Sequence, residues 1–298
     1  MASLKDIRVR IASVSSTRQI TSAMKMVSAA KLRKAQDAII QLRPYAEKFY
    51  EILSTISGNI DSVDDNPYAQ EREIQNVLLV VITSNRGLCG ASNSNVIKAA
   101  LQLAYKQYPN QLNQGNVYFM PIGKKASDFL TKKKYKVIEG NYNTLLDGAT
   151  FEEIAPAAQM VMDAFLNKTY DRIDIIYNQF KNAGVQLTQS EQFLPIKKFQ
   201  PKQVHTMLKA INYDFIFEPS KEYIIRELIP KSLRLSFFKA ILDSLASEHG
   251  ARMTAMHKAT DNATDLIRDL RLQYNKARQS SITNEILEIV SGANALKG

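Results

Sequence analysis

Apolar and small residues recur at alternating steps of four and three along the last part of the chain. The series is Leu242, Ala246, His249, Met253, Met256, Thr260, Ala263, Ile267, Leu270, Tyr274 and Ala277. This spacing is the 3.5-residue repeat of a coiled-coil seam. A helix from about Pro230 to Leu296 would be roughly 100 Å long at 1.5 Å per residue. We expect it to leave the body of the protein and to pair along its length, because typical globular helices have about 8–20 residues.

The N-terminal part of the chain carries the same alternation in one unbroken register. Its positions are Leu4, Ile7, Ile11, Val14, Arg18, Thr21, Lys25, Ser28, Leu32, Ala35, Ile39, Leu42, Ala46, Phe49, Leu53 and Ile56. The pattern predicts a helix to about Ser57, with Gly58 and Asn59 as its stop signal. Pro44 lies within the repeat, which indicates a kink rather than an end. Two such terminal helices predict an antiparallel coiled coil whose strands are joined by an inserted domain.

The N-terminal seam loses its apolar character between Arg18 and Ser28. Over the same span, Ile20, Met24 and Val27 form an apolar stripe beside the seam. One interpretation is a stutter in the coil. The other is that this apolar face turns toward a different partner.

The middle of the chain alternates strand-like and helix-like segments. The run from Val77 to Ile82 is continuously apolar, which is typical of a strand buried on both faces. Further strands are expected at 116–122, 135–138, 174–180, 185–191 and 214–218, and helices at 91–108, 124–131 and 150–168. Thr150, with Glu153 three residues later, predicts the start of the last of these helices. The segment 195–212 is mixed and basic.

These patterns together define an α/β fold class. We expect a long antiparallel coiled coil of N- and C-terminal helices, with an inserted, mostly parallel α/β sheet domain that has an antiparallel edge. The predicted division is an N-terminal coiled-coil helix at 1–58, an α/β domain at 59–219 and a C-terminal coiled-coil helix at 220–298.

Charge is concentrated near the start of the chain. The whole chain has a net charge of +10, and residues 1–36 hold eight Lys and Arg against one acid, a net of +7. Such a segment favours an acidic partner, which could be nucleic acid, anionic lipid or an acidic protein surface. No apolar run reaches the ~18 residues of a membrane span. No signal peptide is expected at the polar N-terminus, and Cys89, the single cysteine, permits no internal disulfide.

Catalytic motifs are missing from the places where they would be expected. The loop 83–90 follows the first strand but has neither G-x-x-x-x-G-K-[ST] nor G-x-G-x-x-G, and Gly123-Lys124-Lys125 only weakly resembles a phosphate loop. Cys89 as a nucleophile would need a nearby base, and we expect an inert, buried thiol. Scattered histidines and one cysteine do not provide a metal site. We therefore expect no catalytic residue, no cofactor and no metal.

Both ends of the chain carry long, specific strings: 20–32 (ITSAMKMVSAAKL), 252–263 (RMTAMHKATDNA), 274–279 (YNKARQ) and 282–286 (ITNEI). In these strings the chain resembles the gamma subunit of bacterial F-type ATP synthases. The loop Arg86-Gly87-Leu88-Cys89-Gly90 is also similar, although Asn85 stands where Asp is expected. The segment 195–212 matches least, and the regulatory cysteine pair of the chloroplast type is absent.

The resemblance implies a non-catalytic rotor shaft. Its coil would turn inside a ring of alternating alpha and beta subunits that hold the nucleotide sites, and its α/β domain would sit on the membrane c-ring beside the epsilon subunit. Such a chain would be a peripheral membrane protein at the cytoplasmic face of the bacterial inner membrane and would bind no nucleic acid. The residues expected to contact partners are Met24, Lys25, Arg33, Lys34, Arg252, Ile282, Ile286 and Ile289.

The C-terminal helix is expected to extend beyond the first helix. Its last apolar stripe, Ile282, Ile286, Ile289, Ala293 and Leu296, then has no partner within the chain, and the register slips by one after Ala277. Two other functions stay open at this point: a nucleic-acid-binding coiled-coil protein, using the basic first helix, and a nucleotide-binding α/β enzyme with coil appendages. Co-purification with other subunits or with nucleic acid discriminates among them.

Overall fold

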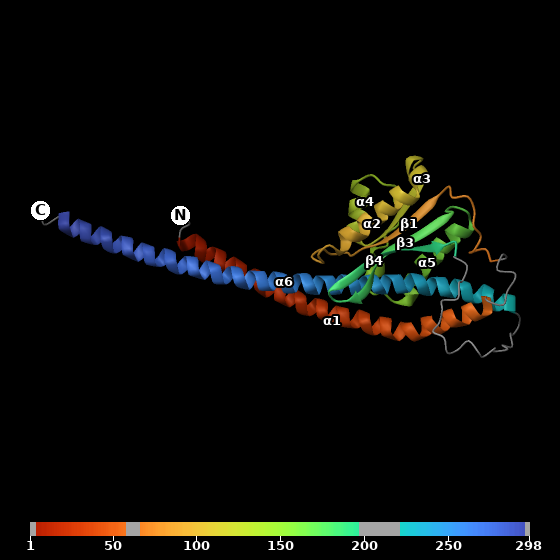
Figure 1. Cartoon of the computed structure of the whole chain (residues 1–298), viewed down its shortest axis with the longest axis horizontal. Helices are drawn as coiled ribbons and strands as arrows, with labels where there is room; N and C mark the ends of the chain where they lie inside the picture. The colour runs from red at the N-terminus through yellow and green to blue at the C-terminus, as the bar shows by residue number, and fades with distance from the viewer. Residues whose placement is uncertain (1–3, 58–65, 197–220, 296–298) are drawn as a thin grey trace. The chain divides into compact units, whose positions relative to one another are not determined.

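The structure is a computed structural model that describes residues 4–57, 66–196 and 221–295. The first and last elements of the chain are two long helices, α1 (Leu4–Ser57) and α6 (Lys221–Ala295) (Figure 1). The other helices and the strands come between them in the sequence. The chain forms two compact units. We call Met1–Ala29 with Arg252–Gly298 the coil unit, and Ala30–Ala251 the sheet unit. The predicted division, at 58 and 219, lies at the expected ends of the long helices and not at the boundaries of these units. It stays a prediction.

The coil unit is an antiparallel pair of helices. A guanidinium nitrogen of Arg8 donates to the Tyr274 hydroxyl at 3.3 Å, and the hydroxyl oxygens of Thr21 and Thr260 lie 2.9 Å apart, so the partners run in opposite directions. Seven of its buried residues are seam residues predicted from the repeat, and Arg252 is buried outside that series: the seven are Ile7, Thr21, Ser28, Met256, Ala263, Ile267 and Leu270. The predicted seam is therefore confirmed on both helices.

The polar positions of the first helix belong to this seam. Thr21 and Ser28 are buried, and their hydroxyls donate to the carbonyls of Arg18 and Met24 at 3.0 and 2.7 Å. These local bonds satisfy hydroxyls that would otherwise be costly to bury. Burial continues in the same register through this span, so the stutter is wrong. Ile20 and Val27 are exposed, which leaves an apolar face outside the seam.

The sheet unit contains a four-stranded sheet in the order β2-β1-β3-β4. The strands are β1 (Val77–Ile82), β2 (Val117–Ile122), β3 (Arg172–Asn182) and β4 (Val185–Leu194). Strand β1 is parallel to β2 and β3, while β4 is antiparallel to β3. The mostly parallel sheet with an antiparallel edge is confirmed.

Helices cover both faces of this sheet. They are α2 (Ser92–Gln107), α3 (Pro109–Asn113), α4 (Lys124–Lys132), the 3-10 turn η2 (Asn143–Leu146) and α5 (Phe151–Leu166). Alternate residues of β1 enter two cores, one shared with α2 and α4 and the other with α5 and α6. This explains why β1 is apolar at every position. The Thr150 hydroxyl accepts from the Glu153 amide at 3.4 Å, which confirms the predicted start of α5.

One predicted strand is wrong. Residues 135–138 form only an isolated parallel bridge, Val137 to Phe119, and no extended ladder. The segment lies between Lys134 and Gly140, both of which have positive φ, at 59° and 127°. These turns leave too short an extended run for a ladder. The predicted strand at 214–218 and nearly all of the segment 195–212 lie outside the described residues.

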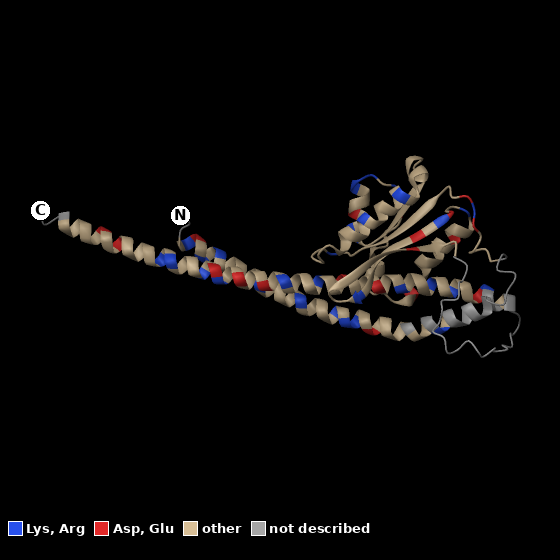
Figure 2. Ribbon diagram, in the orientation of Figure 1, with Lys and Arg blue, Asp and Glu red and all other residues tan. Residues whose placement is uncertain are grey.

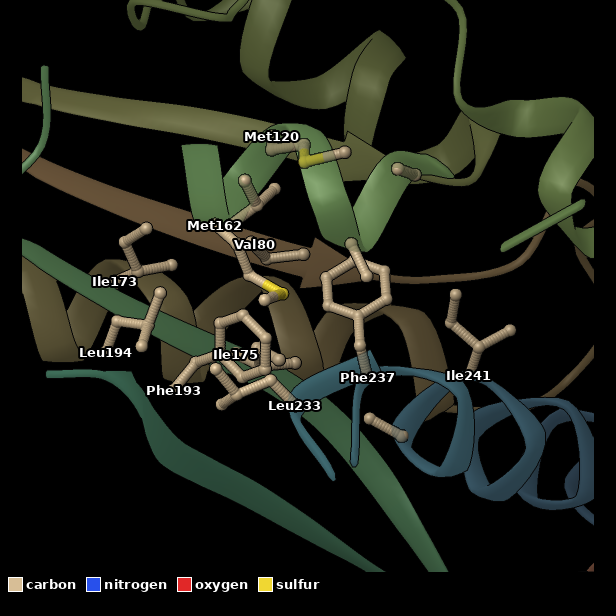
Figure 3. Packing of buried hydrophobic residues seen from close by; sticks show 14 of the residues in the cluster. Val80, Met120, Met162, Ile173, Ile175, Phe193, Leu194, Leu233, Phe237 and Ile241 are labelled. Atoms are coloured by element: carbon tan, nitrogen blue, oxygen red, sulfur yellow. The ribbon is translucent and has the colours of Figure 1, made fainter. Parts of the chain in front are cut away.

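The first part of α6 is a core element of the sheet unit. The helix begins at Lys221 and continues through Pro230, so it starts earlier than the repeat indicated. Ile229, Leu233, Phe237, Ile241 and Leu245 lie about one turn apart and belong to the core shared with the sheet and α5. Figure 3 shows Leu233, Phe237 and Ile241 facing residues of that core. Residues 240–248 are all buried. The expectation that the whole helix leaves the body of the protein is therefore wrong for this part, because its apolar residues complete the core of the sheet unit and the neighbouring polar residues, Asp243, Ser244, Ser247 and Glu248, are buried with them.

Polar contacts fix this part of α6 to the sheet. The Ser247 hydroxyl donates to the Asn178 carbonyl of β3 at 2.9 Å, and the Asn178 amide group donates to Ser92. A Cβ on Gly250 would lie 3.3 Å from Ala183 Cα, in the turn between β3 and β4. A larger residue at 250 would therefore push the turn away. Among the described residues, no helix combines the length and apolarity that crossing a bilayer requires.

Candidate functional site

The loop after β1 is closed by its own hydrogen bonds. Cys89 is buried, and its sulfur accepts from the Asn93 side-chain amide at 3.2 Å and lies 3.8 Å from the Ser84 hydroxyl. Neither neighbour is a general base. This environment fits the predicted inert thiol, because a reactive cysteine needs a thiolate-stabilising cation or base and solvent access.

The neighbouring N-terminus of α4 has no free amide in its first turn. The amides of Lys124, Lys125 and Ala126 donate to Asn85 Oδ1, the Ser84 carbonyl and Thr83 Oγ1, at 3.1, 3.1 and 3.0 Å. Phosphate binding at a helix start requires such amides to be available. The weak resemblance of Gly123-Lys124-Lys125 to a phosphate loop is therefore explained by backbone packing. A Cβ at position 123 would lie 2.4 Å from the Thr83 carbonyl oxygen.

The departure at Asn85 also has a local explanation. Its side-chain NH₂ donates to the Asn143 carbonyl at 2.9 Å, while its oxygen caps Lys124. An ionised aspartate can only accept, so it would cap α4 but would not donate to the 143 carbonyl. Within the described ranges, no cluster of three His, Cys, Asp or Glu side chains has the arrangement of a metal site.

The predicted partner-contact residues fall into separate groups. Met24 and Lys25 are half-buried in the coil unit, and Arg252 is buried there. Arg33 and Lys34 are exposed on the part of α1 that belongs to the sheet unit. Lys and Arg recur along both long helices (Figure 2). The contact roles of all five residues stay predictions.

The free end of α6 carries the remaining predicted residues. Because Arg8 pairs with Tyr274, α6 continues well past the start of α1, as Figure 1 shows. Ile282, Ile286 and Ile289 are 49%, 55% and 71% exposed. The predicted extension is confirmed, and this stripe, which we call the apolar tip, has no cover in the described chain.

The coil unit also contains a groove that the sequence analysis did not predict. It has a volume of about 330 Å³ and is lined by Ile11, Ser15, Arg18, Thr264, Ile267, Arg268, Arg271, Leu272 and Asn275. The only sequence signal is that Arg268 and Arg271 flank seam residues on the α6 turns opposite Arg18. The sequence alone does not show that these arginines are near one another, because that depends on the antiparallel register of α1 and α6.

Comparison with known proteins then identifies the family. The family model described as ATP synthase matches residues 3–296. The ATP synthase gamma chain of Flavobacterium johnsoniae is 56% identical over 298 residues, with 100% of both chains covered. The chain belongs to the gamma-chain family of ATP synthases. The gamma chain of Christiangramia forsetii is 54% identical, also over the full length of both chains.

Solved ATP synthases contain chains of the same fold as this gamma-family member. One, from the OSCP/F1/c-ring structure of the Euglena gracilis mitochondrial enzyme, has a TM-score of 0.65 and 22% identity, covering 98% of this chain and 94% of that one. Another, from the central stalk and c-ring of the Tetrahymena thermophila mitochondrial enzyme, has a TM-score of 0.54 and 25% identity, covering 80% and 99%. The predicted fold and family are thus both confirmed.

For this gamma-family chain, we expect Cys89→Ala and Cys89→Ser to leave complex assembly and ATP hydrolysis near wild type. The thiol fills space in a buried site, and its hydrogen bonds, with the Asn93 amide and the Ser84 hydroxyl, are weak. Steady-state hydrolysis by the purified complex measures the effect. A loss of more than about tenfold, or ~1.4 kcal/mol, in a normally assembled complex would contradict a structural role.

Proposed function

We propose that this chain is the central rotor shaft of a rotary, proton-translocating ATP synthase. It would couple rotation of a membrane ring to conformational change at nucleotide sites on partner subunits. The observation that carries the proposal is the apolar tip of the coil unit, which lacks cover among the described residues of a chain that belongs to the gamma-chain family. Water-exposed isoleucines in a row are typical of a surface that another protein covers.

The proposed partners follow from the two units. The coil unit would lie within a ring of alpha and beta subunits, and the sheet unit would contact the epsilon subunit and the membrane c-ring. We place the chain at the cytoplasmic face of a bacterial inner membrane, as a peripheral subunit active in ion transport. Two solved structures with the same fold come from mitochondrial assemblies described as central stalk/c-ring and OSCP/F1/c-ring, which supports the proposed association with a c-ring. The division at 58 and 219 belongs to the same proposal.

The coil would transmit conformational change by its asymmetry. Exposed Ile20 and Val27 lie on one helix, whereas the tip isoleucines lie on the other. Each ring subunit would therefore meet a different surface at each rotational position. A shaft biases a subunit only through contacts that differ between the subunit's conformations. The same packed seam argues against a nucleic-acid-binding arm, because Ile7 and Ile11 hold the basic helix against α6.

Isolation of the complex tests this function. Affinity-tagged chain expressed in its native cell should co-purify with the ring subunits and with no nucleic acid. Capture of nucleic acid without ring subunits would overturn the proposal.

We also expect the isolated chain to hydrolyse no ATP, because the first-turn amides of α4 are occupied and Cys89 has no adjacent base. Turnover that persists after removal of contaminating ATPases would contradict this.

Removal of the apolar tip should reduce aggregation of the isolated chain. A chain that ends at Ser281 lacks the three exposed isoleucines and should remain soluble at higher concentration, as measured by light scattering. Ile282→Ser, Ile286→Ser and Ile289→Ser together form a full-length control and should have the same effect. Unchanged solubility of both variants would show that the tip is not a sticky surface.

The tip should also be covered in the assembled enzyme. The thiol of the Ile286→Cys variant should react with maleimide in the isolated chain. In the complex, the rate of this reaction should be at least about tenfold lower, since burial removes solvent access to the thiolate. The native Cys89 is buried and gives a low background. Equal rates in both states would argue against a surrounding collar.

A further inference from the structure

Two tyrosines from separate segments of the sheet unit meet at its surface. Tyr105 lies in the last turn of α2, and Tyr135 follows α4, in the segment that forms the isolated bridge with β2. Their hydroxyl oxygens lie 3.2 Å apart, which is within hydrogen-bond distance. Tyr105 is 58% exposed and Tyr135 is half-buried, so solvent and small solutes reach the pair.

Backbone and ring contacts hold Tyr135 in place. The Phe119 amide of β2 donates to the Lys136 carbonyl at 2.8 Å, and the Ile138 amide donates to the Phe119 carbonyl at 3.0 Å. The Tyr135 ring lies edge-on to the fully buried Phe119 ring, with centroids 5.3 Å apart. The backbone of Tyr105 belongs to α2, which packs on the sheet. The two phenols therefore meet from two fixed positions.

The bond between the two hydroxyls persists at neutral pH. This hydrogen bond, together with burial, raises the pKa of Tyr135 to about 12, so the hydroxyl keeps its proton. The bond is exposed and contributes little to folding, since water can replace either partner. Loss of one hydroxyl should therefore leave the fold intact.

We propose that Tyr105 and Tyr135 form an oxidative cross-linking site, at which hydrogen peroxide, acting through a haem peroxidase, joins the two rings as dityrosine. Each phenol loses one electron and its hydroxyl proton, and the two radicals form one carbon–carbon bond between ring positions next to the hydroxyls. The hydrogen atoms on those two carbons then move to the oxygens and restore both hydroxyls. The peroxide accepts the two electrons and two protons and becomes two water molecules.

The contact between the hydroxyls resembles the arrangement in the product. In dityrosine the hydroxyls are attached to the carbons beside the new bond, so the two oxygens are neighbours that can share a hydrogen bond. The oxygens of Tyr105 and Tyr135 already have this relation. Such proximity favours coupling within the pair over coupling to a second chain. Both residues belong to the sheet unit and no partner subunit takes part, so the reaction is independent of the rotor function.

Peptide mapping after oxidation tests the site. Dilute full-length chain is treated with hydrogen peroxide and a haem peroxidase, the monomer is separated from cross-linked dimers, and its peptides are analysed by mass spectrometry. We expect one dominant product, in which the peptides that contain Tyr105 and Tyr135 are joined with the loss of two hydrogen atoms. Tyr105→Phe and Tyr135→Phe keep both rings and should each lower the dityrosine fluorescence of the monomer by at least tenfold.

Tyr45→Phe is the matched control for exposure. Tyr45 is also 58% exposed, but its ring neighbour is Phe49, at a centroid distance of 5.7 Å, and a phenylalanine has no hydroxyl to lose. This variant should keep the fluorescence of the treated monomer within about twofold of wild type. Tyr118 and Tyr170 are the internal control for ring proximity, because their centroids are 5.4 Å apart but their hydroxyls share no hydrogen bond.

Three results would overturn the proposal and leave the rotor function standing. The first is a treated wild-type monomer without dityrosine. The second is dityrosine that joins Tyr118 to Tyr170, or that joins only separate chains. The third is fluorescence that the Tyr105→Phe and Tyr135→Phe variants retain at the level of the Tyr45→Phe control.

Discussion

Reversal of Lys25, Arg33 and Lys34 together to Glu should yield a complex that assembles, hydrolyses ATP and no longer couples hydrolysis to proton uptake. The three side chains have no ion-pair partner in the described part of the chain, and Arg33 and Lys34 are exposed. Single exposed pairs contribute only about 0–1 kcal/mol, so Lys25→Ala alone should be mild. Several cations that act together in a partly desolvated ring contribute several times more.

ATP hydrolysis and ATP-driven proton uptake on the same membranes measure this effect. The matched control reverses Lys98, Lys106 and Lys132, three exposed lysines on α2 and α4, and should retain coupling. If the variant with Lys25, Arg33 and Lys34 reversed assembles and keeps the wild-type ratio of proton uptake to ATP hydrolysis, these charges are only solvated surface groups. The electrostatic part of the proposed mechanism would then be wrong.

Phe237→Ala should destabilise the sheet unit more than any other single change considered for this chain. The ring is fully buried, lies edge-on to Phe193 with centroids 5.7 Å apart, and packs against residues of the sheet and α5 (Figure 3). Truncation of a buried Phe to Ala costs about 3–5 kcal/mol, because transfer energy is lost and a cavity remains. Opening of the sheet should become about 10²–10³ times more frequent, since 1.4 kcal/mol is a factor of ten.

Hydrogen exchange of the β1 amides measures this opening in the full chain. Phe238→Ala is the matched control, because the Phe238 ring is only half-buried and its centroid lies 5.6 Å from that of Phe151. This substitution should accelerate exchange of the β1 amides much less than Phe237→Ala does. Equal acceleration by the two variants would mean that Phe237 has no special place in the core.

The coil was predictable because its information is periodic and local. A seam with alternating steps of four and three specifies which face of each helix is buried, and the structure buries Thr21 and Ser28 in that register although both are polar. The polarity of these positions suggested a stutter, because a pattern of residue types does not reveal that a hydroxyl can bond its own helix. The continuously apolar β1 was equally direct, since each of its faces enters a core.

The features that the sequence did not predict depend on contacts between distant segments. Burial of residues 240–248 requires knowledge that α6 passes beside the β3–β4 turn, where Gly250 leaves room for Ala183. The groove requires the antiparallel register that places Arg18 near Arg268. The strand expected at 135–138 had suitable residues, but the backbone turns beside it limit pairing to one bridge.

The pairing of the two chain ends also has a consequence during protein synthesis. Arg8 and Tyr274 are separated by 266 positions, so at about 5–20 residues per second the ribosome needs roughly 10–50 s to produce the second partner after the first. Throughout that interval the nascent helix presents Ile7 and Ile11 without the chain that covers them. A neighbouring ribosome on the same message carries an identical uncovered segment, and so nascent chains of this protein face one another as competing partners before the native one exists.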